Sequence, residues 1–268
     1  MNSYINQNTS NETHAEYLKS YGFTVLPDFL NTLQVLHFKN LIRIYFEGGK
    51  NRCKGYNNAT IKPDGINDPH FEDLKNIFSN PQLIEIINLM TGNNTRYVHH
   101  FDIHLNKQGS HSWHTDVQNS YSEGKHLLDE LKGVWDKDNI KEDYGVYRIA
   151  LYLQDHTNQG GLSVIPASHL VKDNSKVLNT YQHWNDPFYI KAKSGDCIIF
   201  DARLLHKGNP HNEDRYSIFT ALGVDNAHSK NHAKGAIARQ TKQNLQDEYL
   251  LQPYLKTLLE NKNIKCNY

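Results

Sequence analysis

Short apolar segments with strand periodicity fill the middle of the chain, and this feature restricts the fold more than any other. Gly, Asn or Pro residues bound most of these segments. Apolar and polar residues alternate as in half-buried β-strands, and the short connections favour antiparallel pairing. We predict strands at 96–106, 147–155, 188–193, 196–206 and 215–224, with a shorter one in 160–169. The fold class is therefore mainly β, and a jelly roll that closes two sheets around a pocket suits it.

Helical patterns flank this β-rich centre on both sides. We predict an amphipathic helix at 30–49, whose apolar face comprises Leu30, Leu33, Leu36, Leu41, Ile44 and Tyr45. Before it we predict a short helix at 12–20 and a strand with a turn at 22–29. After it we predict a loop at 50–69 and a helix pair at 70–91, broken at Asn80-Pro81. No repeat or linker is visible, so we expect a single domain over 1–268, with a helical part at about 12–92, a core at about 95–225 and a helical part at about 226–262.

Composition excludes several classes of protein. Lys+Arg and Asp+Glu both total 29, so the net charge is zero, which argues against general binding to nucleic acid or to a charged membrane surface. The three cysteines are widely spaced and indicate neither a disulfide framework nor a zinc finger. No apolar run approaches the roughly 20 residues of a membrane span, and the polar N-terminus lacks a signal core. We expect a cytoplasmic protein, and its oligomeric state stays open.

Two histidines and one carboxylate are spaced to meet at one metal ion. In HSWHTD, His114 and Asp116 lie two residues apart, so an extended segment points both side chains to one face. His206 follows the apolar run CIIFDARLL and is the candidate third ligand. Two histidines and a carboxylate form the facial triad of non-haem Fe(II) oxygenases.

His-x-Asp/Glu occurs five times in a chain with 16 histidines, so the motif alone is not specific. The alternative for His114 and Asp116 is a polar turn with both side chains at the surface, and the alternative for His206 is a structural histidine at a strand end.

Arg215 and Ser217 start the segment after His206 and share one strand face. A guanidinium binds a planar carboxylate through two hydrogen bonds, and a neighbouring hydroxyl adds a third. This pair suits the carboxylate tail of an oxo-acid cosubstrate. The alternative is an exposed arginine paired with Glu213 or Asp214.

Five segments in order resemble the phytanoyl-CoA dioxygenase family of Fe(II)/2-oxoglutarate oxygenases. They are GFTVLPDFL (22–30), WHTD (113–116), GGLSVIPASH (160–169), SGDCIIF (194–200) and HKGNPHNEDRYS (206–217). The resemblance spans about 20–225, and its one departure is Ala167, where the family usually has Gly. It implies a double-stranded β-helix (a cupin-like jelly roll) in which His114, Asp116 and His206 bind Fe(II).

The same resemblance implies the cofactors and the reaction. Arg215, assisted by Ser217, would bind 2-oxoglutarate, and O2 would be the second cosubstrate. The expected reaction is hydroxylation of an unactivated C–H bond in a small molecule, with release of succinate and CO2. A carboxylate at Asp116 argues against halogenation, and the segment 120–145 is a candidate lid. Desaturation or cyclisation stays open, as does a non-oxidative cupin-like metal enzyme or a catalytically silent binding module on the same fold.

Polar residues on the predicted strands are candidate substrate contacts. Strand parity puts Arg148, Tyr152 and Gln154 on one face, and His100, Asp102 and His104 on another. Arg148 would suit a substrate with a carboxylate or phosphate, because a buried unpaired charge is costly; the alternative is a salt bridge to Asp102 or Asp143. The candidate substrate-binding residues are Arg148, Tyr152, His104 and Trp113.

Overall fold

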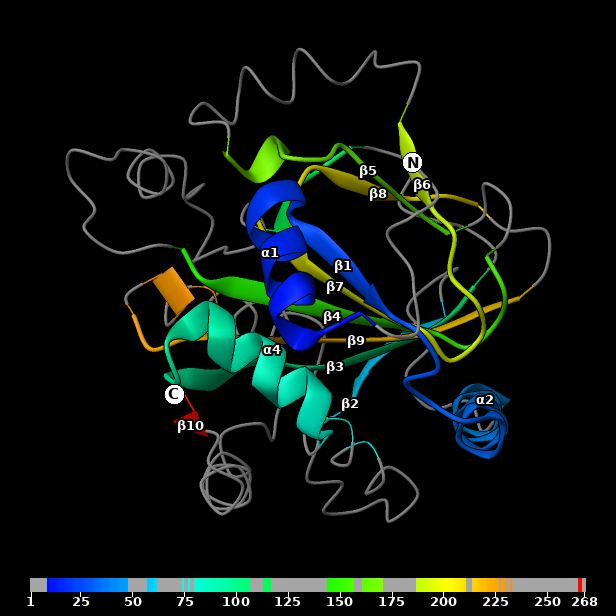
Figure 1. The fold of residues 1–268 in the computed structure, drawn as a ribbon. Helices are drawn as coiled ribbons and strands as arrows, with labels where there is room; N and C mark the ends of the chain where they lie inside the picture. The colour runs from blue at the N-terminus through cyan, green and yellow to red at the C-terminus, as the bar shows by residue number, and fades with distance from the viewer. Residues whose placement is uncertain are drawn as a thin grey trace, which may run out of the picture.

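Two β-sheets form the body of the structure, a computed structural model (Figure 1). It describes residues 9–47, 57–61, 74, 77, 80–106, 113–116, 144–156, 161–170, 187–210, 214–226, 228–229, 232 and 265–266. The strands are β1 (Phe23–Leu26), β2 (Asn57–Ile61), β3 (Thr95–Asn106), β4 (Val146–Tyr152), β5 (Leu162–Val164), β6 (Phe188–Ile190), β7 (Cys197–Asp201), β8 (His206–Gly208), β9 (Arg215–Val224) and β10 (Lys265–Cys266).

The larger sheet has the order β1-β7-β4-β9-β3-β10, with β2 also paired to β3, and the smaller sheet has the order β6-β5-β8. Every pairing is antiparallel except that of β10 with β3. Neighbours in space are distant in sequence, because the chain passes repeatedly between the sheets. The mainly β jelly-roll core predicted from the strand pattern is confirmed.

Helices cover one face of the large sheet. Figure 1 shows α1 (Asn11–Tyr21) and α4 (Pro81–Thr91) beside each other in front of it. Their apolar side chains join the outward residues of β4, β7 and β9 in one buried cluster, which includes Leu18, Leu83, Ile149 and Ile199. The opposite face of these strands turns toward the small sheet and contributes Ala150, Tyr152, Ile198 and Phe200 to a second cluster. Alternate residues of one strand therefore serve two different interiors.

The helix ends follow local capping rules. The Ser10 and Asn80 side chains accept the backbone N–H groups of Thr13 and Leu83, and α1 and α4 each end at a glycine in the left-handed conformation. These caps explain why the boundaries predicted at 12–20 and at the Asn80-Pro81 break are nearly those observed.

The predicted apolar face of the next helix is wrong. The helix itself is confirmed as α2 (Thr32–Glu47), but Leu33, Leu36 and Ile44 are exposed. The buried stripe instead comprises Val35, Phe38, Leu41, Ile42 and Phe46. Apolar residues occur on most sides of this helix, and the stripe that carries both phenylalanines packs inward because aromatic rings bury the most area.

Two strand assignments also need correction. The segment 196–206, predicted as one strand, is β7, a turn, and then β8 in the other sheet. Asp201 causes the break: its carboxylate accepts hydrogen bonds from the backbone N–H and the guanidinium of Arg203. The segment 50–69, predicted as loop, contains the strand β2.

Most of the predicted helical part at 226–262 lies outside the described residues. Among those described, no helix is both long and apolar enough to cross a membrane.

A glycine before β7 gives a test of how closely its turn packs against the segment between β1 and α2. Gly195 has φ +93°, and a Cβ atom there would lie against the backbone carbonyl oxygen of Leu30. The backbone N–H of Leu30 in turn donates a hydrogen bond to the carbonyl of Gly195. We expect Gly195→Ala to lower the free energy of unfolding by about 3 kcal/mol or more, from backbone strain plus overpacking. Gly92→Ala is the matched control, because Gly92 has φ +62° with nothing near its Cβ position; it should lose about 1 kcal/mol. Urea denaturation measures both, and equal losses would contradict the prediction.

A buried histidine of α1 should make stability depend on pH. His14 lies beneath β1, with its Nδ1 2.7 Å from the Thr24 hydroxyl, and burial lowers its pKa from 6.5. The folded state therefore binds a proton less readily than the unfolded state, and stability falls as the pH drops below that value. Between about pH 7.5 and about pH 5.5, the free energy of unfolding should decrease more in the native protein than in His14→Gln. An equal decrease in both, measured by urea denaturation, would contradict this.

Candidate metal centre

Backbone hydrogen bonds bring the predicted metal-binding segments together. His114 and His206 form an isolated antiparallel bridge, in which each N–H donates to the other's carbonyl at 3.0 and 2.9 Å. The N–H of Asp116 donates to the carbonyl of Ala202, in the turn between β7 and β8, at 2.9 Å. The His114 segment thus extends the small sheet along β8, and the three candidate ligands do not depend on a metal to meet.

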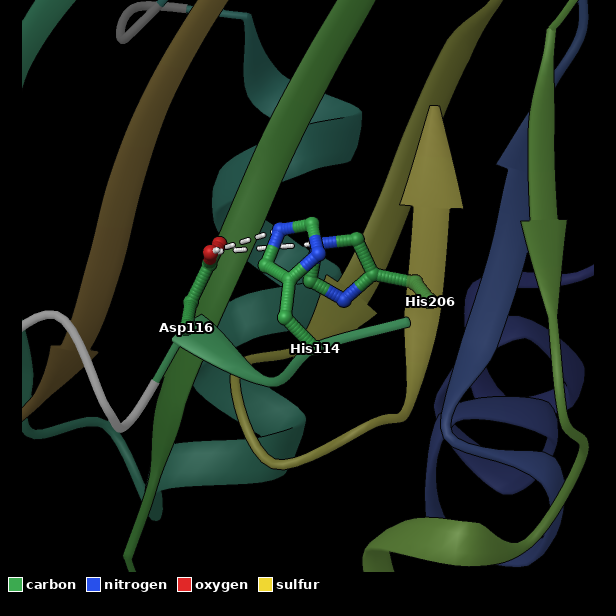
Figure 2. Close-up of side chains that lie close together, drawn as sticks. All are labelled: His114, Asp116 and His206. Atoms are coloured by element: carbon green, nitrogen blue, oxygen red, sulfur yellow. Dashed lines mark ion pairs between the residues drawn. The ribbon is translucent and has the colours of Figure 1, made fainter. Parts of the chain in front are cut away.

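The three side chains point toward one another (Figure 2). Each offers a ligand atom, and these atoms all lie within 4.8 Å of one another. Oδ1 of Asp116 is 3.9 Å from Nε2 of His114 and 3.7 Å from Nε2 of His206. Nitrogen and oxygen ligands bind first-row metals at about 2.0–2.2 Å, so two ligands of one ion lie at most about 4.4 Å apart. The two separations from Asp116 lie below this limit and fit a single ion.

The hydrogen bonding of His206 prepares its imidazole for metal binding. Its Nδ1 lies 2.9 Å from the carbonyl oxygen of Leu204, and a carbonyl only accepts, so Nδ1 carries the proton. The lone pair is then on Nε2, the atom that faces Asp116. Burial, with the neighbouring His114, lowers the pKa of His206 to about 4, so the ring is neutral near pH 7.

Asp116 is nearly buried and ion-paired with Arg148. Nε of Arg148 lies 2.9 Å from Oδ2 of Asp116, and its Nη2 lies 3.8 Å from Oδ2 of Asp102. Burial by itself raises the pKa of Asp116, but the charge of Arg148, followed by those of nearby histidines, outweighs it and holds the pKa below its usual range. The salt bridge to Asp102 considered from the sequence is thus present at long range, whereas Asp143 lies outside the described residues.

Arg215 and Ser217 lie on the inner face of β9. Both are buried, and Nη1 of Arg215 donates to the carbonyl of Asn209 at 3.2 Å. Ser217 is opposite Tyr152 on β4 and His104 on β3, and its hydroxyl has no hydrogen-bond partner among the described residues. A fully buried hydroxyl without a partner is uncommon. Next to a guanidinium, it fits a site that receives a carboxylate from a ligand.

The remaining candidate substrate contacts fall into two groups. Tyr152 and His104 lie in the interior between the sheets, where each ring meets the edge of Phe219, at 5.8 and 5.2 Å between centroids. Burial raises the pKa of Tyr152, and the charge of Arg215 offsets part of that rise. Trp113 instead packs with Ile165 and Leu205, with the Lys207 ammonium 5.0 Å from its ring centre.

Sequence reasoning missed two buried residues near the triad. The hydroxyl of Tyr144 lies 3.0 Å from Nδ1 of His232. Burial and, after it, the nearby carboxylates Asp201 and Asp116 raise the pKa of Tyr144, and His232 is among the histidines that lower the pKa of Asp116. Tyr144 and His232 are 88 residues apart and belong to no motif, so no sequence signal pairs them. The candidate lid, 120–145, lies outside the described residues apart from Tyr144 and Gly145.

Solved structures with a similar fold include two enzymes of nogalamycin biosynthesis. The non-heme alpha ketoglutarate dependent epimerase SnoN from nogalamycin biosynthesis aligns with TM-score 0.60 and 14% identity, covering 80% of this chain and 81% of that chain. The corresponding carbocyclase, SnoK, aligns with TM-score 0.59 and 16% identity, covering 81% and 85%. HygX from Streptomyces hygroscopicus, solved with nickel and 2-oxoglutarate bound, aligns with TM-score 0.57 and 14% identity, covering 81% and 87%. A search of curated protein sequences found no match.

Family membership rests on the sequence itself. The family profile described as Phytanoyl-CoA dioxygenase (PhyH) matches residues 18–216, which is more than half of the chain. The matched range contains β1, α2, α4, all three candidate metal ligands and the first residues of β9. The chain therefore belongs to the phytanoyl-CoA dioxygenase (PhyH) family.

Proposed function

We propose that this protein is an Fe(II)- and 2-oxoglutarate-dependent dioxygenase that hydroxylates an unactivated C–H bond of a small molecule, releasing succinate and CO2. The observation that carries the proposal is the convergence of His114, Asp116 and His206 on one point within the jelly roll. Two imidazoles and one carboxylate leave other coordination positions open and are the set that non-haem Fe(II) oxygenases use. Family membership supports the same reaction class.

The three ligands would hold iron from one side, and Arg215 with Ser217 would bind the distal carboxylate of 2-oxoglutarate. When bound, iron and 2-oxoglutarate supply the activation of O2 and the oxidation of the C–H bond. The protein's own part is placement: the Leu204 carbonyl fixes the ring of His206, and the bridge to His114 fixes the second imidazole. Aromatic side chains between the sheets, including Tyr152 and Phe200, exclude water from the interior.

A second outcome deserves a direct test, because two neighbours of similar fold are described as an epimerase and a carbocyclase. Hydroxylation places one oxygen atom of O2 in the product, whereas epimerisation and ring closure place none there. Reaction under labelled O2, once a substrate is found by succinate release, distinguishes them by the mass of the product. An intact carboxylate at Asp116 favours hydroxylation over halogenation, since a halide needs that coordination position.

The single-domain organisation over 1–268 and a cytoplasmic location stay predictions. The substrate class, a small molecule, follows by analogy with the neighbours named above and belongs to the proposal. The candidate roles of Tyr152, His104 and Trp113 in binding it are part of the same proposal.

Anaerobic addition of Fe(II) and 2-oxoglutarate tests the function directly. We expect a weak visible charge-transfer band in the native protein and its loss in His206→Ala. Arg215→Met should weaken 2-oxoglutarate binding about 10- to 100-fold, because hydrogen bonds to charged groups contribute about 1.5–3 kcal/mol.

Arg96→Gln is the matched control for Arg215→Met. Arg96 is a partly buried arginine of the same sheet that pairs with Asp225 at 3.0 Å, away from the triad. This variant should keep the band. Iron binding by the native protein without any band would contradict the proposal and favour the non-oxidative metal enzyme or the silent binding module.

Ser217→Ala separates a cosubstrate contact from a structural serine. The Ser217 hydroxyl has no hydrogen-bond partner among the described residues, so its removal should not lower the free energy of unfolding of the metal-free protein. It should weaken 2-oxoglutarate binding about 5-fold, for the loss of one hydrogen bond worth about 1 kcal/mol. Thermal unfolding and titration of the charge-transfer band measure the two effects. A destabilised protein with unchanged 2-oxoglutarate affinity would show that the hydroxyl is structural.

A further inference from the structure

The two oxygens of the Asp116 carboxylate face different partners. Oδ1 lies toward the imidazoles, 3.7 and 3.9 Å from the two Nε2 atoms, whereas Oδ2 lies 2.9 Å from Nε of Arg148. A metal ion among the three ligand atoms therefore meets Oδ1. For both oxygens to bind the ion, Oδ2 would have to leave the guanidinium.

Arg148 is itself placed by a second carboxylate. It lies on β4 opposite Ala221 of β9, and Asp102 lies beyond β9 on β3. Its Nη2 is 3.8 Å from Oδ2 of Asp102, so the side chain crosses β9 over the small Ala221 residue. The guanidinium is thus attracted at both ends by carboxylates from different parts of the chain.

Burial strengthens these ion pairs. The Arg148 side chain is 9% exposed, and those of Asp116 and Asp102 are 12% and 15% exposed. Attraction between charges is stronger away from water, and removing one member leaves a buried charge uncompensated. A long, flexible side chain held in this way keeps one orientation.

We propose that Arg148 is a positioning residue for the metal-binding carboxylate. It holds Oδ2 of Asp116 so that Oδ1 alone is presented to the metal, and the coordination position that a second oxygen would take stays open for a cosubstrate. This inference rests on the proposed function. It gives Arg148 a role other than the substrate contact predicted from the sequence: an anionic substrate would have to compete with two carboxylates already beside the guanidinium.

The first experiment uses Co(II) alone, without 2-oxoglutarate, on the full chain. Its visible absorption reports the coordination of the ion, and calorimetry gives its affinity. We expect the visible absorption of Co(II) at saturation to differ between Arg148→Met and the native protein, because Asp116 becomes free to bind through both oxygens. The affinity should change as well, because the variant has lost a group that orients a metal ligand. Arg148→Lys, which keeps the charge but not the planar fork, should fall between the two.

Arg96→Gln serves again as the control. It removes a partly buried arginine from an ion pair in the same sheet, so a general loss of stability affects it too. Its Co(II) affinity and spectrum should equal those of the native protein.

A second experiment compares two variants that both lack the Asp116 carboxylate. Asp116→Gly removes the ligand and leaves Arg148 in place, and added formate supplies a carboxylate that the guanidinium can hold. Formate should restore Co(II) binding to Asp116→Gly but not to Asp116→Gly/Arg148→Met, which lacks the guanidinium that would hold the added carboxylate.

The outcomes separate the two proposals. If the native protein binds Co(II) and Arg148→Met matches it in affinity and spectrum, or formate rescues both glycine variants equally, the role of Arg148 is wrong while the proposed function stands. If the native protein binds Co(II) and the Arg148 effects appear, but 2-oxoglutarate gives no band with Fe(II), the positioning role stands and the dioxygenase proposal fails. If the native protein binds no Co(II), both fail.

Discussion

The backbone bridge between His114 and His206 is the constraint on which the candidate centre depends. It joins two segments that are far apart in sequence, and it uses main-chain groups alone, with each N–H donating to the other's carbonyl. A third bond, from the N–H of Asp116 to the Ala202 carbonyl, sets the end of the same segment. Because the ligands are placed by backbone hydrogen bonds, their side chains are available to bind an ion.

That placement brings several charged groups into a poorly hydrated interior, and the way they are paired limits the free-energy cost of burying them. Asp116 and Asp102 lie on either side of Arg148, so the two buried carboxylates share one guanidinium. His206 stays neutral because burial lowers its pKa to about 4. A dication beside Asp116 would meet one carboxylate and two neutral donors, while the charge of Arg148 is compensated by the second carboxylate. Without Asp102, the guanidinium and the ion would compete for the charge of Asp116 alone.

The features predicted correctly from the sequence are those that local residue patterns determine. Strand periodicity predicted β3, β4 and β9, and the helix predicted at 12–20 and the break at Asn80-Pro81 lie within a residue or two of the observed helix starts. Sequence reasoning failed where tertiary contacts decide. On α2 the stripe with Phe38 and Phe46 is buried, although Leu33 and Leu36 are equally apolar.

The same limit applies to the site. The ligand types and their order could be predicted from the chain, as could Asp102 as one of two candidate partners of Arg148. The pairing of Arg148 with Asp116 could not, because backbone bonds between distant segments place Asp116 there. The turn at Asp201, which moves His206 into the small sheet, is likewise invisible in an apolar run. Tyr144 and His232 meet only through the fold.

A shared fold does not fix the reaction, because function resides in sites built on it. The epimerase and carbocyclase that share this architecture carry out different conversions. For this chain, the groups that would hold iron and 2-oxoglutarate come from β8, β9 and the bridged His114 segment, whereas Tyr152 and His104 come from β4 and β3. If Tyr152 and His104 contact the substrate as proposed, substitutions there would alter how it lies relative to the metal without removing a metal ligand. Substrate choice and metal binding would then be set by different strands of one scaffold.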